Sequence, residues 1–212
     1  MFKDISFSKP NHQNKKLSEI WDERYLCSHY LFGEEPVTGL KQLISQLKKG
    51  KCLDIAMGEG RNTVFLAKSG FQAEGIELSS NAIEKAKKLA TKHQVSIEAK
   101  TQNLDFFLMP LMRYETVVMT YFKPLVRFFS EIRRGLVLGG TLFIEAYLTN
   151  ELRYHANKHP NLESIVSIDE CYRSNELLHY LKESFEVLYY RELLSDENEC
   201  HTVVALVRKT KV

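Results

Sequence analysis

The sequence predicts an α/β fold built on a doubly wound, mostly parallel sheet of seven strands, with an antiparallel hairpin at its C-terminal end. Short apolar runs alternate with segments of helical periodicity, which is typical of parallel strands joined by right-handed crossovers. The chain has 212 residues, a length that suits one domain. The last two apolar runs of the sequence are separated by the turn residues 195–198, which indicates the hairpin. We therefore expect residues 1–212 to form a single domain.

The strands are predicted from short apolar runs that end at turn residues. The fourth run is apolar throughout its core, which indicates burial on both faces of the sheet. The third run is more polar and is expected nearer an edge. The five predicted parallel strands cover residues 52–56, 71–76, 96–101, 116–121 and 141–147, and the hairpin covers 185–192 and 201–208.

Helices are predicted between these strands. The clearest covers residues 125–138, where one stripe is apolar and Gly139–Gly140 is expected to end the helix. Ser18 is the expected N-cap of a helix over 18–27, and Asn81 that of a helix over 82–93. Further helices are predicted over residues 36–48, from 61 to the stop at Gly70, and over 175–181.

A glycine turn joins the first strand to the helix that follows it. Gly58 and Gly60 allow the backbone to turn sharply and to approach a ligand closely. The helix that begins at Arg61 would direct its first N–H groups at a carboxylate or phosphate. Thr63 stands where a dinucleotide fingerprint would have its third glycine, and no Gly-Lys-Ser/Thr follows, which excludes a P-loop.

Two acidic residues end the first two predicted strands. Asp54 would repel a pyrophosphate but suits a ligand that carries a cation. Glu77 ends the second strand, where a carboxylate commonly accepts both hydroxyl hydrogens of a ribose. The acids and the glycine turn together predict a nucleoside ligand with a positively charged group.

The runs LDIAMGEGRNTVFLAKSGF and GIELSSNAIEKAKKLA resemble the class I S-adenosylmethionine-dependent methyltransferases. Within that family the sequence is most similar to the tellurite-resistance-type, small-molecule branch, which residues 21–25, Tyr30 with 33–36, and Gly139–Gly140 also fit. The resemblance runs from about residue 21 to the C-terminus. It implies a Rossmann-like sheet and the methyl donor S-adenosylmethionine, bound along the carboxyl ends of the first, second and fourth strands.

By this resemblance, Asp54 and the backbone around Met57 serve the amino-acid end of the donor, and Glu77 serves its ribose. Asn103 stands where relatives have aspartate and would accept a hydrogen bond from the adenine amino group, while Asp105 is the alternative if the register shifts by two. Arg61 is either a donor contact or a solvated first-turn residue. The implied donor-binding residues are Tyr25, Asp54, Ala56, Met57, Gly58, Gly60, Arg61, Asn62, Glu77, Leu78, Asn103, Leu104, Thr120 and Tyr121.

The acceptor side is predicted from the order of the elements. Ligands of an open parallel sheet lie beyond the carboxyl ends of the strands, so residues 25–32 and the aperiodic stretch 148–160 are expected to close the pocket. Residues 1–48, an N-terminal arm with helices, would form part of this lid. Tyr30 and the three candidate catalytic residues are expected near the methyl group, and of these only the histidine can act as a base near neutral pH. The candidates are His155, Tyr25 and Tyr121.

No metal is predicted. His155 and His159 have the spacing of half a metal site, but no glutamate accompanies them and Pro160 would end any helix there. Trp21 is assigned to packing against the sheet.

Composition narrows the class of partner. The formal net charge of +2 shows no bias toward nucleic acid, and the four scattered cysteines favour a reducing compartment. No apolar run approaches the ~20 residues that cross a bilayer. These features predict a cytoplasmic protein with a small-molecule substrate, and neither a nucleic-acid nor a membrane partner.

The predicted activity is methylation of a small thiol, a chalcogen oxyanion or a similar soft nucleophile, which is what the resemblance implies. An N-P-P-Y-type tetrapeptide, the usual mark of amino-group methylation on bases, is absent after the fourth strand, where residues 120–124 read TYFKP. Two alternatives stay open. One is a non-catalytic S-adenosylmethionine-binding protein. The other is an NAD-dependent oxidoreductase, against which the missing third glycine and Asp54 both count.

Overall fold

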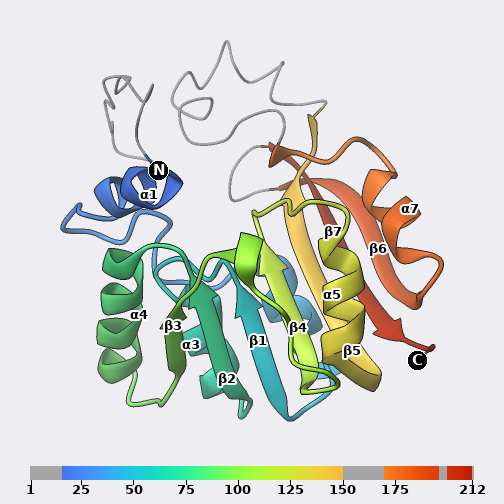
Figure 1. The fold of residues 1–212 in the computed structure, drawn as a ribbon, viewed down its shortest axis with the longest axis horizontal. Helices are drawn as coiled ribbons and strands as arrows, with labels where there is room; N and C mark the ends of the chain where they lie inside the picture. The colour runs from blue at the N-terminus through green and yellow to red at the C-terminus, as the bar shows by residue number, and fades with distance from the viewer. Residues whose placement is uncertain (1–15, 150–169, 196–199, 212) are drawn as a thin grey trace.

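Seven strands form one sheet in the order β3-β2-β1-β4-β5-β7-β6, as Figure 1 shows. The computed structural model describes residues 16–149, 170–195 and 200–211. Strands β1 to β5 run parallel to their neighbours in this group, and β7 runs antiparallel to both β5 and β6. The predicted fold class is therefore confirmed. The strands are β1 Lys51–Ile55, β2 Gln72–Glu77, β3 Glu98–Thr101, β4 Tyr114–Thr120, β5 Leu136–Tyr147, β6 Phe185–Ser195 and β7 Cys200–Lys209.

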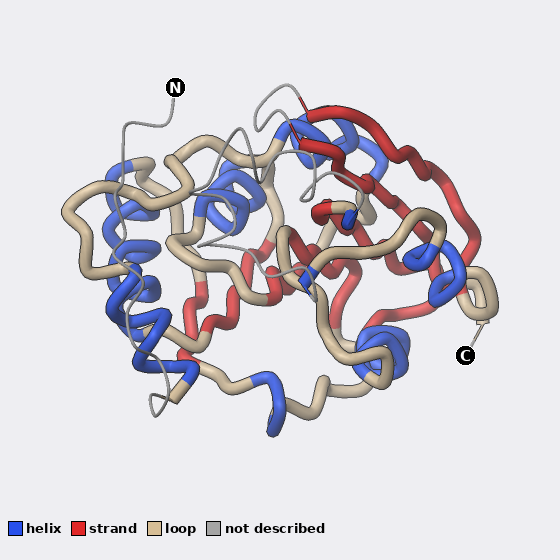
Figure 2. Tube along the Cα trace, turned by 90° about the horizontal axis from the view of Figure 1, so that it is seen from above, coloured by secondary structure: helices blue, strands red, loops and turns tan. Residues whose placement is uncertain are grey.

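Helices cover both faces of this sheet. In Figure 1, α5 and α7 lie in front of the sheet and α3 lies behind it. The view from above in Figure 2 shows the sheet end-on, with helices on either side. The helices are α1 Leu17–Arg24, α2 Thr38–Leu43 with the 3₁₀ turn η1 Ile44–Gln46, α3 Arg61–Lys68, α4 Ser80–Lys92, the 3₁₀ turn η2 Leu104–Phe106, α5 Phe128–Gly135 and α7 Glu176–Leu181.

The core consists of two apolar layers, one on each face of the sheet. Successive side chains of a strand point to opposite faces. On β4, Val117 and Met119 therefore pack in the layer that contains α5 and α7. Val118, between them, packs in the layer that contains α2 and Leu66 of α3. The side chains of Val117, Val118 and Met119 are fully buried, as the continuous apolar run predicts.

The predicted helix over residues 125–138 is shorter in the structure. Helix α5 ends at Gly135, and Leu136 already begins β5. Gly139 and Gly140 do not end a helix but lie within β5, where its pairing register with β4 is irregular. Leu136 is nevertheless buried. Helical periodicity marks residues that face the core, and a strand that continues into the same layer satisfies that pattern equally well.

Both predicted N-caps lie one or more residues inside their helices. Ser18 is within α1, whose N-cap is Lys16. Helix α4 is capped by Ser79, whose Oγ accepts a hydrogen bond from the N–H of Ala82 at 3.2 Å. Asn81 is in the first turn of α4, where its Nδ2 donates to the backbone oxygen of Asp22 at 3.0 Å. A contact between distant segments therefore uses the side chain that local sequence assigns to the cap.

Candidate functional site

A cavity of about 300 Å³ opens at the carboxyl ends of β1, β2 and β4. Strands β2 and β4 lie on opposite sides of β1, so the cavity occupies the point where the strand order reverses. Open α/β sheets bind their ligands at this point. All the predicted donor-binding residues line the cavity except Asp54 and Gly60.

The glycine turn between β1 and α3 forms one wall of the cavity. Gly58 has a φ of 54°, and a Cβ there would lie 3.0 Å from Tyr25 Oη. Its N–H donates to Glu77 Oε2 at 2.9 Å. Gly60, with a φ of 84°, faces helix α4 instead, because a Cβ there would lie 2.6 Å from Ala86 Cβ. Gly58 thus keeps the cavity open, whereas Gly60 allows the turn to pack on α4.

Glu77 holds the end of β2 against this turn. Its Oε1 accepts hydrogen bonds from the N–H groups of Leu78 at 2.7 Å and Ser79 at 3.0 Å, in addition to the bond from Gly58 to Oε2. Burial raises the pKa of this carboxyl, and the three backbone hydrogen bonds oppose that rise. An ionised carboxylate has about four acceptor positions, so Glu77 retains capacity for a ligand hydroxyl.

Asp54 lies behind the cavity wall rather than in it. Its side chain is fully buried, and Oδ2 accepts a hydrogen bond from Thr63 Oγ1 at 2.7 Å. Oδ1 has no hydrogen-bond partner among the described residues. Burial raises the pKa of Asp54 to about 7, although the Thr63 hydrogen bond lowers it. A buried carboxyl with an unpartnered oxygen is costly to ionise, and it is well placed to favour a cation nearby.

The stability of the protein should fall between about pH 4 and pH 8 because of Asp54. An unfolded aspartate has a pKa of about 3.9. Between that pH and about pH 7, the folded state therefore binds one proton more than the unfolded state. Stability then decreases as pH rises, by roughly 4 kcal/mol in total for this one group. Urea unfolding at pH 5 and pH 8 should show the decrease in the wild type and a smaller one in Asp54→Asn. Glu77, whose pKa is also raised, keeps part of the slope.

The matched control for this measurement is Asp105→Asn, which changes an exposed aspartate in the same way. It should retain the full decrease of the wild type. An equal decrease in Asp54→Asn would assign the titration to another group.

Two residues of the first turn of α3 connect the cavity wall to the chain before β1. Arg61 Nη1 donates to the backbone oxygen of Phe32 at 2.8 Å, and its guanidinium lies 5.9 Å from the Tyr121 ring. Asn62 accepts from the N–H of Val37 at 3.0 Å and donates to Thr120 Oγ1 at 2.9 Å. Arg61 therefore lines the cavity, and its contact with the donor stays a prediction.

The predicted adenine end of the cavity contains both candidate acceptors. Asn103 and Asp105 each line the cavity. They contact one another, because Asn103 Oδ1 accepts from the N–H of Asp105 at 2.9 Å. This places both at the start of η2, and the choice between them stays a prediction.

Tyrosines form the other end of the cavity. Tyr121 has a φ of 51°, and its ring centroid lies 4.5 Å from that of Tyr147, with the two rings tilted by 34°. Its hydroxyl donates a hydrogen bond to Glu145 Oε1 at 2.9 Å. Burial and then the charge of Glu145 raise the pKa of Tyr121 well above its usual value. Burial and Glu77 do the same for the pKa of Tyr25. Both phenols therefore stay protonated near neutral pH, where they can orient a substrate but cannot act as bases.

The remaining predicted residues lie elsewhere. Tyr30 does not line the cavity and instead donates its hydroxyl hydrogen to the backbone oxygen of Lys85 at 3.2 Å. Trp21 is not packed on the sheet. It lines the cavity and stacks 5.6 Å from Tyr25. His155 and His159 lie outside the described residues, as does most of the predicted lid segment 148–160.

Sequence reasoning missed several cavity residues. The position of Tyr147 at the end of a parallel strand was a usable signal, and so was that of Glu59 inside the glycine turn. The others come from loops whose course only the fold defines. The missed residues are Leu17, Gly33, Glu59, Ile76, Gln102, Phe122, Lys123, Tyr147 and Glu170, whereas Phe32 belongs to the predicted closing segment 25–32.

Two structural features bear on the other predictions. Within the described ranges, no helix is long and apolar enough to cross a membrane. The same ranges contain no cluster of three or more histidine, cysteine, aspartate or glutamate side chains that could hold a metal ion.

Residues 52–140 match the family model described as "Methyltransferase domain". The match begins in β1, includes the glycine turn and the Glu77 strand, and ends within β5. The matched residues thus include the part of the chain that forms most of the cavity.

One curated relative is the 23S rRNA (uracil(747)-C(5))-methyltransferase of Pyrococcus horikoshii, with 25% identity over 154 residues. That alignment covers 69% of this chain but 35% of the relative, so the chain spans about a third of that protein's length.

Solved structures of methyltransferases share the fold. TehB from Haemophilus influenzae superposes with a TM-score of 0.66 at 16% identity, over 91% of this chain and 67% of that one. Geranyl diphosphate C-methyltransferase from Streptomyces coelicolor, in complex with Mg²⁺, geranyl-S-thiolodiphosphate and S-adenosyl-L-homocysteine, superposes with a TM-score of 0.63 at 13% identity, over 80% and 74% of the two chains. Identities this low establish the fold alone.

Proposed function

We propose that this chain, which matches a methyltransferase family model over residues 52–140, is an enzyme that transfers the methyl group of S-adenosylmethionine to a small molecule with a soft nucleophile. A thiol and a chalcogen oxyanion are the acceptors we favour. The observation that carries the proposal is the pairing of Gly58 with Glu77, which brings an open backbone turn and a ribose-type carboxylate together at the reversal point of the sheet.

Two features of the chain fit this donor. A Cβ at Gly58 would lie 3.0 Å from Tyr25 Oη, in the space through which the backbone of the turn would approach the donor. The unpartnered Asp54 Oδ1 lies behind the turn, and an ammonium group of an amino acid nearby would favour the ionised form of this carboxyl. When bound, S-adenosylmethionine supplies an electrophilic methyl group on a sulfonium cation.

The residues of the chain have separable tasks in this proposal. The turn from Ala56 to Gly58 binds the amino-acid end, Glu77 accepts from the ribose, and Asn103 accepts from the adenine. The faces of Tyr25 and Tyr121 suit the sulfonium charge, because aromatic rings attract cations. All of these residues line the same cavity.

Catalysis then depends mainly on alignment. Holding two reactants in line can supply up to roughly 7–11 kcal/mol of the barrier reduction. Neither Tyr25 nor Tyr121 accepts a proton near neutral pH, since burial raises the pKa of both. This supports an acceptor that arrives already ionised, as a thiolate or an oxyanion does. We retain His155 as the proposed base for an acceptor that is protonated.

Calorimetry with S-adenosylmethionine, S-adenosylhomocysteine and NAD on the purified chain tests the donor. We expect both sulfur ligands to bind and NAD to fail. Binding of NAD alone would favour the oxidoreductase alternative.

The acceptor is tested with methyl-labelled donor and separate panels of small thiols, selenium and tellurium oxyanions, and an rRNA fragment. We expect label in a thiol or oxyanion product. Label in the RNA alone would overturn the small-molecule assignment, and bound donor without transfer to any panel would support the non-catalytic alternative.

A further inference from the structure

The N-terminal strap, which we define as residues 21–33, forms part of the cavity although it lies far from the glycine turn in sequence. Trp21, Tyr25, Phe32 and Gly33 line the cavity. Figure 1 shows α1, where the strap begins, above the carboxyl ends of the strands and close to the start of α4. A donor bound in the cavity would therefore lie beside the strap.

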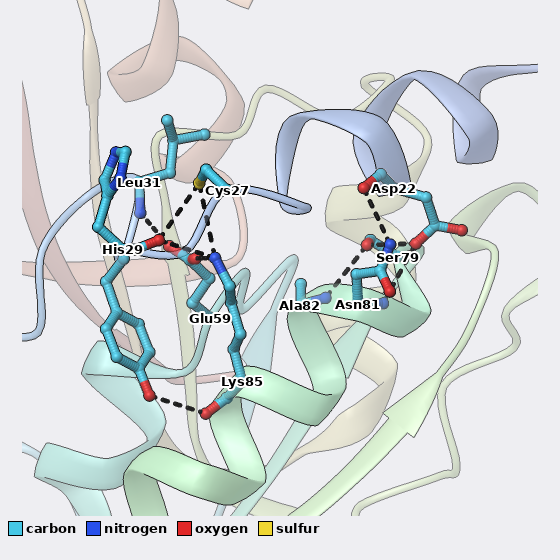
Figure 3. Close-up of polar contacts among 10 residues, drawn as sticks. Asp22, Cys27, His29, Leu31, Glu59, Ser79, Asn81, Ala82 and Lys85 are labelled. Atoms are coloured by element: carbon cyan, nitrogen blue, oxygen red, sulfur yellow. Dashed lines mark hydrogen bonds and ion pairs between the residues drawn. The ribbon is translucent and has the colours of Figure 1, made fainter. Parts of the chain in front are cut away.

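One polar contact fixes the beginning of the strap to helix α4. Asp22 Oδ1 accepts a hydrogen bond from Ser79 Oγ at 2.5 Å and from the N–H of Asn81 at 3.2 Å, as Figure 3 shows. A carboxylate at this position also interacts favourably with the dipole of α4. The contact anchors the last turn of α1.

A second contact, centred on Lys85, fixes the end of the strap. Lys85 Nζ donates to Glu59 Oε1 at 2.7 Å and to the backbone oxygen of His29 at 2.8 Å. Glu59 Oε2 in turn accepts from the N–H of Leu31 at 2.6 Å. Figure 3 shows these groups converging between α4 and the strap. Lys85 thereby joins three segments, which are α4, the strap and the glycine turn that contains Glu59.

The environment makes this ion pair more consequential than a surface pair. The side chains of Lys85 and Glu59 are only 16% and 3% exposed. Charged hydrogen bonds are strong in such surroundings, and removing one partner leaves the other charge buried without compensation. Without Lys85, the Glu59 carboxylate would have to move toward water, and the strap and the turn that it connects would be released.

We propose that Lys85 is a positioning residue that sets the affinity for the donor by holding the strap and the glycine turn together. The inference rests on the proposed function for the identity of the donor. Lys85 does not line the cavity, so its effect must pass through Glu59 and the strap. If the strap is in place only part of the time, the apparent dissociation constant rises by the inverse of that fraction.

The experiment compares Lys85→Met, Lys85→Arg and the wild type in two measurements. S-adenosylhomocysteine affinity is measured by calorimetry. The position of the strap is measured without any ligand by acrylamide quenching of Trp21, the single tryptophan of the chain. Arg113→Met is the matched control, because Arg113 forms a 3.2 Å ion pair with Glu74, of which 8% is exposed, away from the cavity.

Lys85→Met should bind S-adenosylhomocysteine roughly tenfold more weakly, as a closed fraction near one tenth would give. Its Trp21 should be quenched more readily. Lys85→Arg, which keeps the charge and can reach Glu59, should restore both values to within about threefold. Arg113→Met should lower the thermal midpoint and leave affinity and quenching unchanged.

Wild-type affinity and quenching in Lys85→Met would overturn the inference, and so would equal losses in Arg113→Met. If Lys85→Met does not fold, Glu59→Gln, which removes the other charge of the pair, replaces it, and the Trp21 measurement then decides, because Glu59 itself lines the cavity. A wild type that binds no S-adenosylhomocysteine would refute the proposed donor, and with it the affinity role of Lys85. The Trp21 measurement would still decide whether Lys85 holds the strap.

Discussion

Replacing Gly58 with valine should abolish binding of S-adenosylmethionine. The backbone φ of 54° at this position is unfavourable for any side chain and most unfavourable for a β-branched one. The new Cβ would lie 3.0 Å from Tyr25 Oη. The valine methyl groups would extend beyond it at a position that lines the cavity. Calorimetry with S-adenosylhomocysteine, on protein shown to be folded by circular dichroism, measures the loss.

The control for this variant is Gly70→Val. Gly70 also has a positive φ, 84°, but a Cβ there would meet no atom within 4 Å. Both variants should therefore lose stability from backbone strain, by about 1–2 kcal/mol or more. Only Gly58→Val should lose the ligand. If the two variants bind S-adenosylhomocysteine equally well, the donor does not lie against Gly58.

Removing the carboxylate of Glu77 should weaken donor binding by about 1–3 kcal/mol, or roughly 5- to 150-fold, the range for losing a buried polar partner. Two effects contribute. A ribose hydroxyl would lose its acceptor, and the N–H groups of Gly58, Leu78 and Ser79 would lose theirs, so the turn would no longer be held against β2. Calorimetry of Glu77→Ala with S-adenosylhomocysteine and with adenosine gives the comparison.

Adenosine carries the ribose but lacks the amino-acid end, so a similar loss for both ligands would assign the effect to the ribose. Glu84→Ala is the control. It removes the same group from an exposed position on α4 and should bind both ligands as the wild type does. Wild-type affinity in Glu77→Ala would remove Glu77 from the site.

Much of the cavity was predictable because local sequence determines the geometry around it. The run before Gly58 is apolar and short, so it forms β1, and the residues that follow a buried parallel strand must emerge at its carboxyl end. Glu77 is the last residue of β2 and Thr120 the last residue of β4, so the same logic places both at this edge. The three strand ends meet because the alternation of strands and helices imposes one topology.

Element ends were less predictable, and the errors have a common cause. Leu136 fits the apolar stripe of α5 but belongs to β5, and Asn81 resembles a cap but bonds to Asp22. In each case the side chain has two suitable environments locally. Contacts with segments far away in the chain decide between them, and no local pattern records those contacts.

By itself, the sequence determined the order of strands and helices, the glycine turn, the acids at the strand ends and the family that they resemble, because each depends on neighbours along the chain. Only the tertiary structure decided that Asp54 lies behind the cavity wall, that Trp21 lines it, and that Lys85 joins Glu59 to the strap. These positions depend on which surfaces meet when helices pack on the sheet. Lys85 and Glu59 are 26 residues apart, and each reads in the sequence as an ordinary solvated charge. Burial, which the sequence does not record, is what makes the pair consequential.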